Sequence, residues 1–158
     1  MRSISRKLAA AATALSLAAT SGAMPAVAAT VACFQTADME ADQAMRFQTE
    51  LMVLSDTCGV TSYRDFTVRN REQIIAYQHQ LLDHFKRIGA RSPQASLDSF
   101  LTQIANESAL KDGRELREVV CSRSATLFVT AQTLDSEHFR VRASELATTN
   151  QATYRRCK

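Results

Sequence analysis

Apolar side chains recur every three or four residues from about residue 37 to the end of the chain, which is the spacing of one face of an α-helix. Glycine and proline interrupt this pattern. Gly59, Gly89 and Gly113 each stand where the apolar spacing breaks, as expected where helices end, and Ser92-Pro93 suits the start of a new helix. No β-strand alternation competes with the helical spacing. The pattern therefore predicts an all-α fold.

The breaks divide the chain into four arms that span about residues 37–57, 62–88, 93–134 and 136–157. The second arm carries one polar residue, Asn70, on its apolar seam, and the third arm is broken near Gly113. If both pieces of the third arm point the same way, the chain forms an up-down bundle of four to five helices. If the two pieces fold back on each other, the last arm runs in the opposite direction.

The start of the chain has the features of a secretory signal peptide. Three cations, Arg2, Arg6 and Lys7, precede an apolar run at residues 8–19, and a small-x-small pattern ends at Ala28. We expect cleavage after Ala28 or after the next residue. The apolar run is shorter than the roughly 20 residues that a membrane-spanning helix needs.

The predicted organisation is a signal peptide over residues 1–29 and one mature helical domain over residues 30–158, located in the periplasm or outside the cell. Small residues before Cys33 also fit a lipoprotein signal, although Thr30 stands where that signal usually has leucine. Without the three cations of the leader, the 19 Lys and Arg residues fall to 16, which equals the number of Asp and Glu residues. This balance argues against a nucleic-acid partner, because phosphate binding needs an excess of cations.

Four cysteines fall in the predicted mature domain, and an even count in an exported domain predicts two disulfides. No two of them are close enough in sequence for a zinc, haem or C-x-x-C redox motif. Cys33 and Cys58 lie at opposite ends of the first arm and cannot meet. Of the two remaining connectivities, the up-down arrangement favours Cys58–Cys121 with Cys33–Cys157, whereas a folded-back third arm would not allow this pairing.

Polar residues on otherwise apolar helical stretches are the candidate binding residues. Asn70 lies on the seam of the second arm, and Asn106 and Ser108 belong to a polar stretch over residues 102–108. Such residues either form a buried polar layer that fixes helix register or face a ligand pocket or partner. With His84, which flanks the seam of the second arm, they are the positions where we expect a site.

A metal or acid–base site is the alternative hypothesis. It requires His79, Asp83 and His84 to converge with the Asn106 region, and surface or half-buried histidines explain the same residues without a site. The common nucleophile, P-loop, dinucleotide and H-E-x-x-H patterns are missing, so no cofactor and no catalytic residue is predicted.

The first arm carries Met39, Met45 and Met52, which with interleaved leucines suit a flexible core or contact surface better than a copper site. Together with the missing catalytic motifs, this favours a non-catalytic binding or interaction protein. Its partner would be an envelope protein or a small ligand.

Several stretches resemble a family of small exported four-cysteine helical proteins of alphaproteobacteria, whose function is unknown. The stretches that carry the resemblance are Gln48–Val53 ahead of Cys58, Tyr63–Phe66, His84–Arg87, Thr102–Ser108 and Cys121. The resemblance implies an envelope location. It brings no activity, cofactor or catalytic residue.

Overall fold

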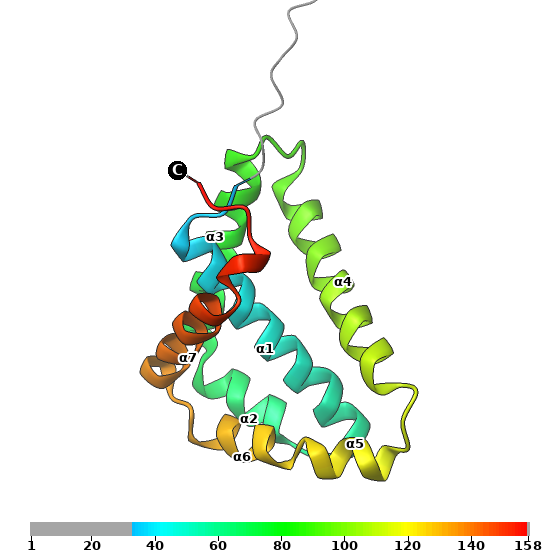
Figure 1. Ribbon diagram of the computed structural model, residues 1–158. Coiled ribbons are helices and arrows are strands. Elements are labelled where there is room, and N and C mark those ends of the chain that lie inside the picture. The colour runs from blue at the N-terminus through cyan, green and yellow to red at the C-terminus, as the bar shows by residue number, and fades with distance from the viewer. Residues whose placement is uncertain (1–32, 158) are drawn as a thin grey trace, which may run out of the picture.

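The computed structural model describes residues 33–157, and the regular structure of these residues is helical (Figure 1). The α-helices are α1 (Thr36–Cys58), α2 (Ser62–Arg69), α3 (Arg71–Arg87), α4 (Pro93–Asp112), α5 (Arg117–Arg123), α6 (Ala125–Thr133) and α7 (Ser136–Thr149). A 3₁₀ turn, η1 (Gln151–Thr153), follows α7. The predicted all-α fold is confirmed, with more and shorter helices than the four to five expected. The expected signal peptide lies outside the described residues.

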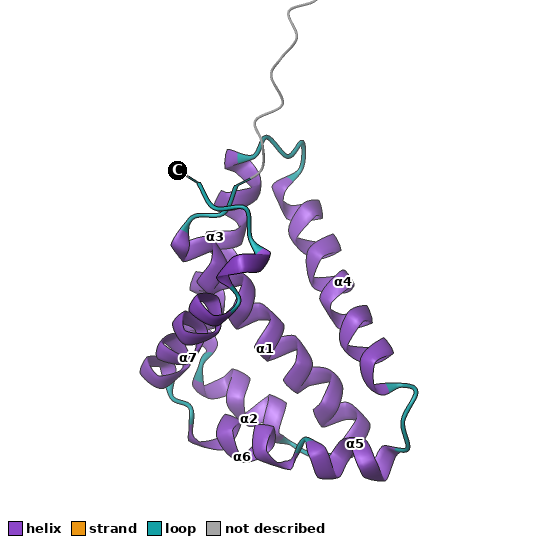
Figure 2. Cartoon of the chain, viewed as in Figure 1, coloured by secondary structure: helices purple, strands orange, loops and turns teal. Residues whose placement is uncertain are grey.

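Within residues 33–157, the longest helix is α1, which contacts each of the other six α-helices and forms the centre of the fold (Figures 1 and 2). Ala41, Ala44 and Leu51 on α1 are fully buried. The helix ends at Gly59, whose φ of 68° lies in the left-handed region that glycine adopts without strain. The backbone N–H of Val60 then donates to the Ser55 carbonyl, which closes the last turn.

The second predicted arm is two helices, because the chain breaks at Asn70. The Asn70 backbone leaves the helical region, with φ −109° and ψ 16°. Its side-chain amide donates to the carbonyl oxygens of Phe66 (3.0 Å) and Leu134 (3.1 Å). Asparagine favours such breaks because its side chain competes for backbone hydrogen bonds. The break ties α2 and α3 to the connection between α6 and α7.

The third predicted arm is not one broken rod. Only the first piece of this arm, helix α4, runs along α1. Helices α5 and α6 cross the end of the fold, and α7 then returns along α1 (Figure 1). Helices α5 and α6 are separated at Ser124, whose hydroxyl donates to the Val120 carbonyl (2.8 Å). The last arm, α7, still runs in the expected direction, from the Cys58 end of α1 back towards the Cys33 end. Helices α5 and α6, rather than a continued third arm, bring the chain to the start of α7.

Two disulfides close the fold, and their pairing is as predicted. Cys33 pairs with Cys157 and Cys58 with Cys121, with Cα–Cα distances of 4.9 and 5.6 Å. They lie at the two ends of α1. Beside the first, the backbone N–H of Phe34 donates to the Arg155 carbonyl (2.8 Å), and the backbone N–H of Cys157 donates to the Phe34 carbonyl (3.0 Å). The N- and C-terminal ends of the described chain are therefore joined both covalently and by a short parallel bridge.

Aromatic side chains fill the centre of the core. Phe66 and Tyr77 both meet Phe139 edge to face, with ring centroids 4.9 and 5.5 Å apart. Phe47 completes the cluster from α1. This arrangement is favourable for aromatic rings and fixes α1, α2, α3 and α7 around one point.

Removing the disulfide at the far end of α1, in a Cys58→Ala/Cys121→Ala double variant, should lower the free energy of unfolding by about 4 kcal/mol, because the unfolded chain gains the entropy of the opened loop. Urea unfolding of the oxidised protein measures the loss. Cys33→Ala/Cys157→Ala is the matched variant at the other end and should lose a similar amount. An unchanged unfolding midpoint in both would contradict the stapling role.

Candidate functional site

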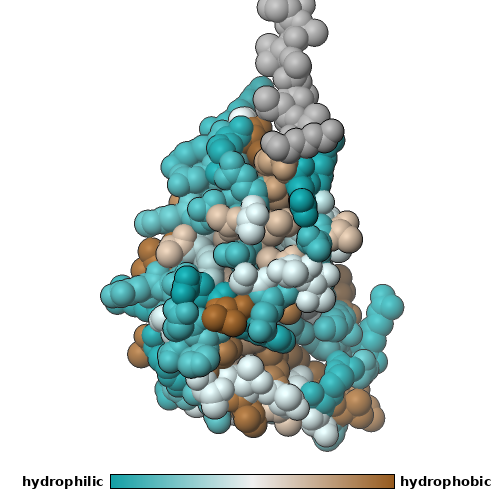
Figure 3. Space-filling view, turned by 60° about the vertical axis from the view of Figure 1, so that its left-hand side comes forward, coloured by the Kyte–Doolittle hydropathy of each residue, from teal (hydrophilic) through white to brown (hydrophobic). Residues whose placement is uncertain are grey.

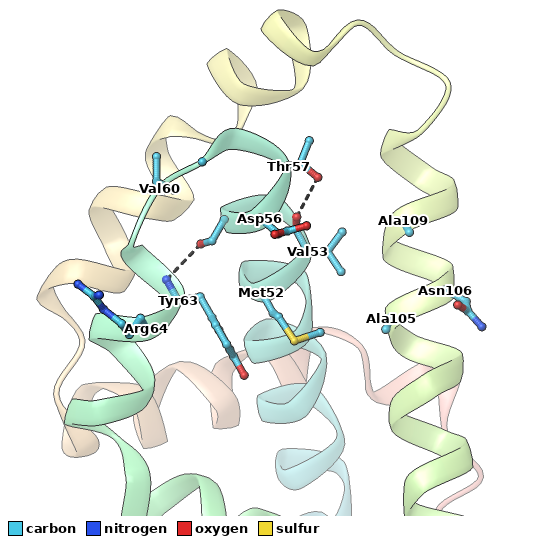
Figure 4. A pocket seen from close by; sticks show the side chains of 12 residues that line it. Met52, Val53, Asp56, Thr57, Val60, Tyr63, Arg64, Ala105, Asn106 and Ala109 are labelled. Atoms are coloured by element: carbon cyan, nitrogen blue, oxygen red, sulfur yellow. Dashed lines mark hydrogen bonds between the residues drawn. The ribbon is translucent and has the colours of Figure 1, made fainter.

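An open groove of about 830 Å³ lies between the second half of α1, the start of α2 and the second half of α4 (Figure 4). Met52 and Val53 line it from α1, Tyr63 from α2, and Ala105 and Ala109 from α4. The two alanines face α1 across the groove. The walls are therefore mainly apolar, with small side chains on one side and larger ones on the other.

The groove continues a stripe of α1 that is buried nearer its start. The stripe steps by three and four residues, and its members are Asp38, Asp42, Met45, Thr49, Met52 and Asp56. The first four are buried and the last two are exposed. The methyl groups of Ala105 and Ala109, one turn apart on α4, are too small to fill the space beside Met52. An apolar side chain on the central helix is thus left 36% exposed.

Polar and charged groups stand at the rim of the groove. Asp56 and Arg64 lie on α1 and α2 respectively, and Arg64 has an ion pair with its neighbour Asp65 at 3.5 Å. The backbone N–H of Tyr63 donates to the Ser55 hydroxyl (3.1 Å), which holds the start of α2 against α1 (Figure 4). The rim thus offers charges of both signs around an apolar centre.

The structure does not bring the four predicted binding residues together. Asn106 lines the groove, although its amide points away from it in Figure 4. Ser108 lines a second pocket on the other side of α4. Asn70 and His84 are buried in the interior, away from both pockets.

His84 belongs to a buried cluster around the carboxylate of Asp38. The His84 Nδ1 lies 3.1 Å from this carboxylate, and Arg87 forms an ion pair with it. The carboxylate also accepts hydrogen bonds from the Gln80 side chain (2.8 Å) and from the backbone N–H of Gln35 (2.8 Å). Burial alone would raise the pKa of Asp38, but the hydrogen bonds from Arg87, Gln35 and Gln80 and the charge of His84 lower it below its ordinary value. The cluster fixes α3 against the start of α1.

A second buried carboxylate, Asp42, lies one turn further along α1. It accepts hydrogen bonds from the Tyr154 hydroxyl and from Gln43 (3.2 Å), and it pairs with Arg46 (3.0 Å). Burial and the bond to Asp42 raise the pKa of the Tyr154 phenol. Gln43 in turn accepts from the Asn150 amide (3.0 Å). This network holds the C-terminal segment on α1.

The sequence interpretation did not single out Asp38 or Asp42. A signal for them was present, because both share a stripe with Met45 and Met52 at helical spacing. Charged residues at core positions of a long amphipathic helix need partners from other elements. That signal identifies the carboxylates but not the residues that pair with them.

The residues of the metal or acid–base hypothesis do not converge. His79 and Asp83 are exposed, Asp83 pairs with Lys86 (2.7 Å), and none of His79, Asp83 and His84 lines the groove beside Asn106. Across residues 33–157, no three His, Cys, Asp or Glu side chains are grouped closely enough to hold a metal ion. Nor does any helix within this range have the length and hydropathy needed to cross a membrane.

Comparisons with known proteins add no relative: no family model, curated protein or solved structure matches the chain. The groove, the second pocket and the buried carboxylates are therefore the observations from which function is inferred.

Replacing Asp38 by Asn should lower the free energy of unfolding at pH 7 by about 2 kcal/mol, because Arg87 and His84 lose a buried carboxylate partner. The folded-state pKa of Asp38 lies below its unfolded-state value of about 3.9. Its contribution is therefore present above that value and is lost as the pH falls through the folded-state pKa.

Urea unfolding of wild type and Asp38→Asn between pH 7 and pH 2 measures this dependence. The two proteins should differ most near neutrality and converge in acid. Asp83→Asn, an exposed carboxylate on α3, is the control and should change little. A gap that stays constant across the whole pH range would contradict the assigned role of the Asp38 carboxylate.

Proposed function

We propose that the protein is an exported, non-catalytic binding module of the cell envelope and that the groove between α1, α2 and α4 is its binding surface. The observation that carries the proposal is the exposure of Met52 on the central helix, in an apolar groove whose volume is typical of binding sites. A methionine suits such a surface because its flexible thioether adapts to different partners. By contrast, the face in Figure 3 is largely hydrophilic, with scattered apolar residues.

The occupant we infer is a short amphipathic helix of an envelope protein. Ala105 and Ala109 leave room for another helix to approach α4, and they lie only about 6 Å apart along its axis. The groove therefore receives one or two large apolar side chains, which act as anchors. Asp56 and Arg64 at the rim would pair with charges of both signs that flank the anchors.

Export is supported by the four cysteines and by the composition of the first 29 residues. All four cysteines are paired, in two disulfides that close most of the chain into loops. Such bonds persist in oxidising compartments and are rare in the cytosol. Membership of the alphaproteobacterial family that the sequence resembles stays a prediction.

Protein recovered from its native cells should be found outside the cytoplasm and should begin at Ala29 or Thr30, because a signal peptidase removes the leader. N-terminal sequencing and intact mass measure this directly. A mature chain that begins at Cys33 and carries a lipid mass would instead identify a lipoprotein. Protein that retains residues 1–29 in the cytoplasm would contradict the proposal of export.

A photo-crosslinking amino acid in place of Met52 should yield one discrete adduct in native cells, because the partner helix covers this position. The same amino acid in place of Val141, an exposed apolar residue of α7, is the control and should yield no such adduct. Mass spectrometry identifies the adduct and the crosslinked segment. A protein crosslinked through an amphipathic helix supports the inferred occupant, whereas a small-molecule adduct would overturn it.

Two matched substitutions on α4 test whether the groove itself is used. Ala109→Glu places a charge in the groove and should abolish the Met52 adduct. Leu110→Glu places the same charge one residue further along, at a position where the leucine is 69% exposed, and should leave the adduct intact. An adduct that survives Ala109→Glu would contradict the groove as the binding surface.

A further inference from the structure

A second pocket, of about 400 Å³, lies between α1, α4, α6 and α7. It lies on the other side of α4 from the groove, and the two share no lining residue. Apolar side chains from all four helices contribute to its lining, namely Phe47, Ile104, Leu127 and Leu146. The pocket is thus built where four elements meet, and an apolar group can be received there.

Charged side chains from three of these helices also line the pocket. Arg46 pairs with Glu107 and Lys111 pairs with Glu50, each at 3.0 Å, so these charges neutralise one another across α1 and α4. The fifth charged residue of the lining is Arg142 of α7, and two carboxylates stand just behind the lining, Asp42 at 3.0 Å from Arg46 and Glu145 at 3.7 Å from Arg142.

Arg142 is the residue of this lining best placed to receive an anion. Its carboxylate neighbour is Glu145, one turn along the same helix, at 3.7 Å. This distance is longer than a hydrogen bond, and the Arg142 side chain is 45% exposed. A guanidinium presents several N–H donors in one plane, which suits carboxylates, sulfonates and phosphates.

Polar groups that are already ordered complete the wall. Gln43 is 8% exposed, and its amide is fixed by Asn150 on one side and by Asp42 on the other. Ser108 adds a hydroxyl from α4. The pocket therefore combines a rigid polar wall, an apolar lining and one half-exposed guanidinium, which can bind the acidic group of a ligand.

We propose that this pocket binds a small organic monoanion with an apolar body, whose acidic group is held by Arg142. The inference goes beyond the proposed function, because it concerns a separate site and a different class of ligand. The apolar body contacts Leu127 and Leu146, and the acidic group accepts hydrogen bonds from the guanidinium.

The probe for the first experiment is 8-anilino-1-naphthalenesulfonate, a monoanion with an apolar aromatic body whose fluorescence rises when it is bound. It should bind the oxidised wild-type protein saturably at one site. Octanoate should displace it, and octanol, which has the same chain length without the charge, should displace it far less. Absence of saturable binding, or equal displacement by acid and alcohol, would overturn the proposal.

Arg142→Gln should weaken probe binding by about tenfold, because the charged hydrogen bonds to the sulfonate are lost. Arg140→Gln removes a neighbouring exposed arginine of α7 that pairs with Glu137 and does not line the pocket, so it should bind as wild type does. Equal weakening in both variants would show a general effect of surface charge and would refute the assigned site.

Ala109→Glu separates this proposal from the proposed function, since it blocks the groove alone. Probe binding that survives Ala109→Glu and fails in Arg142→Gln supports the pocket, whatever the crosslinking result. Loss of probe binding in Ala109→Glu with no change in Arg142→Gln would place the probe in the groove and overturn the pocket proposal. Thermal unfolding of each variant checks that the fold is retained.

Discussion

The burial of Asp38 and Asp42 on the central helix is the constraint on which the described fold depends. A buried carboxylate without partners costs several kcal/mol, so each must draw polar groups from other elements. Asp38 takes Gln80, His84 and Arg87 from α3, and Asp42 takes Tyr154 from the C-terminal segment. Each carboxylate thus positions an element at the start of α1, next to the Cys33–Cys157 disulfide.

The same helix explains why one side of the molecule is open. In the first half of α1, where the carboxylates lie, the stripe is buried, whereas beyond Thr49 it meets the alanines of α4 and remains exposed. Helix α4 therefore has the groove on one side and the charged pocket on the other. On the pocket side, the Arg46–Glu107 and Lys111–Glu50 pairs connect it to α1.

The helical class could be predicted from the apolar spacing of the sequence. The length of the first helix excluded only the Cys33–Cys58 pair, and the choice between the two remaining disulfide pairings depended on the direction assumed for the last arm, which the structure bears out. The breaks at Asn70 and Ser124 could not, since they depend on side-chain hydrogen bonds that periodicity does not detect. The groove was also beyond prediction: it is formed by small side chains on α4 opposite Met52, and only Asn106 among the candidate residues reaches it. Periodicity shows which face of a helix is apolar but not which part of that face stays uncovered.

Amide hydrogen exchange of the oxidised protein at neutral pH, followed residue by residue, tests the central claim about α1 most directly. Protection reports the free energy needed to expose each backbone hydrogen bond. The amides of the first half of α1, around Asp42 and Met45, should be among the slowest to exchange and should open only with global unfolding. If they exchanged as fast as those of the exposed helix α5, α1 would not be the clamped centre of this fold.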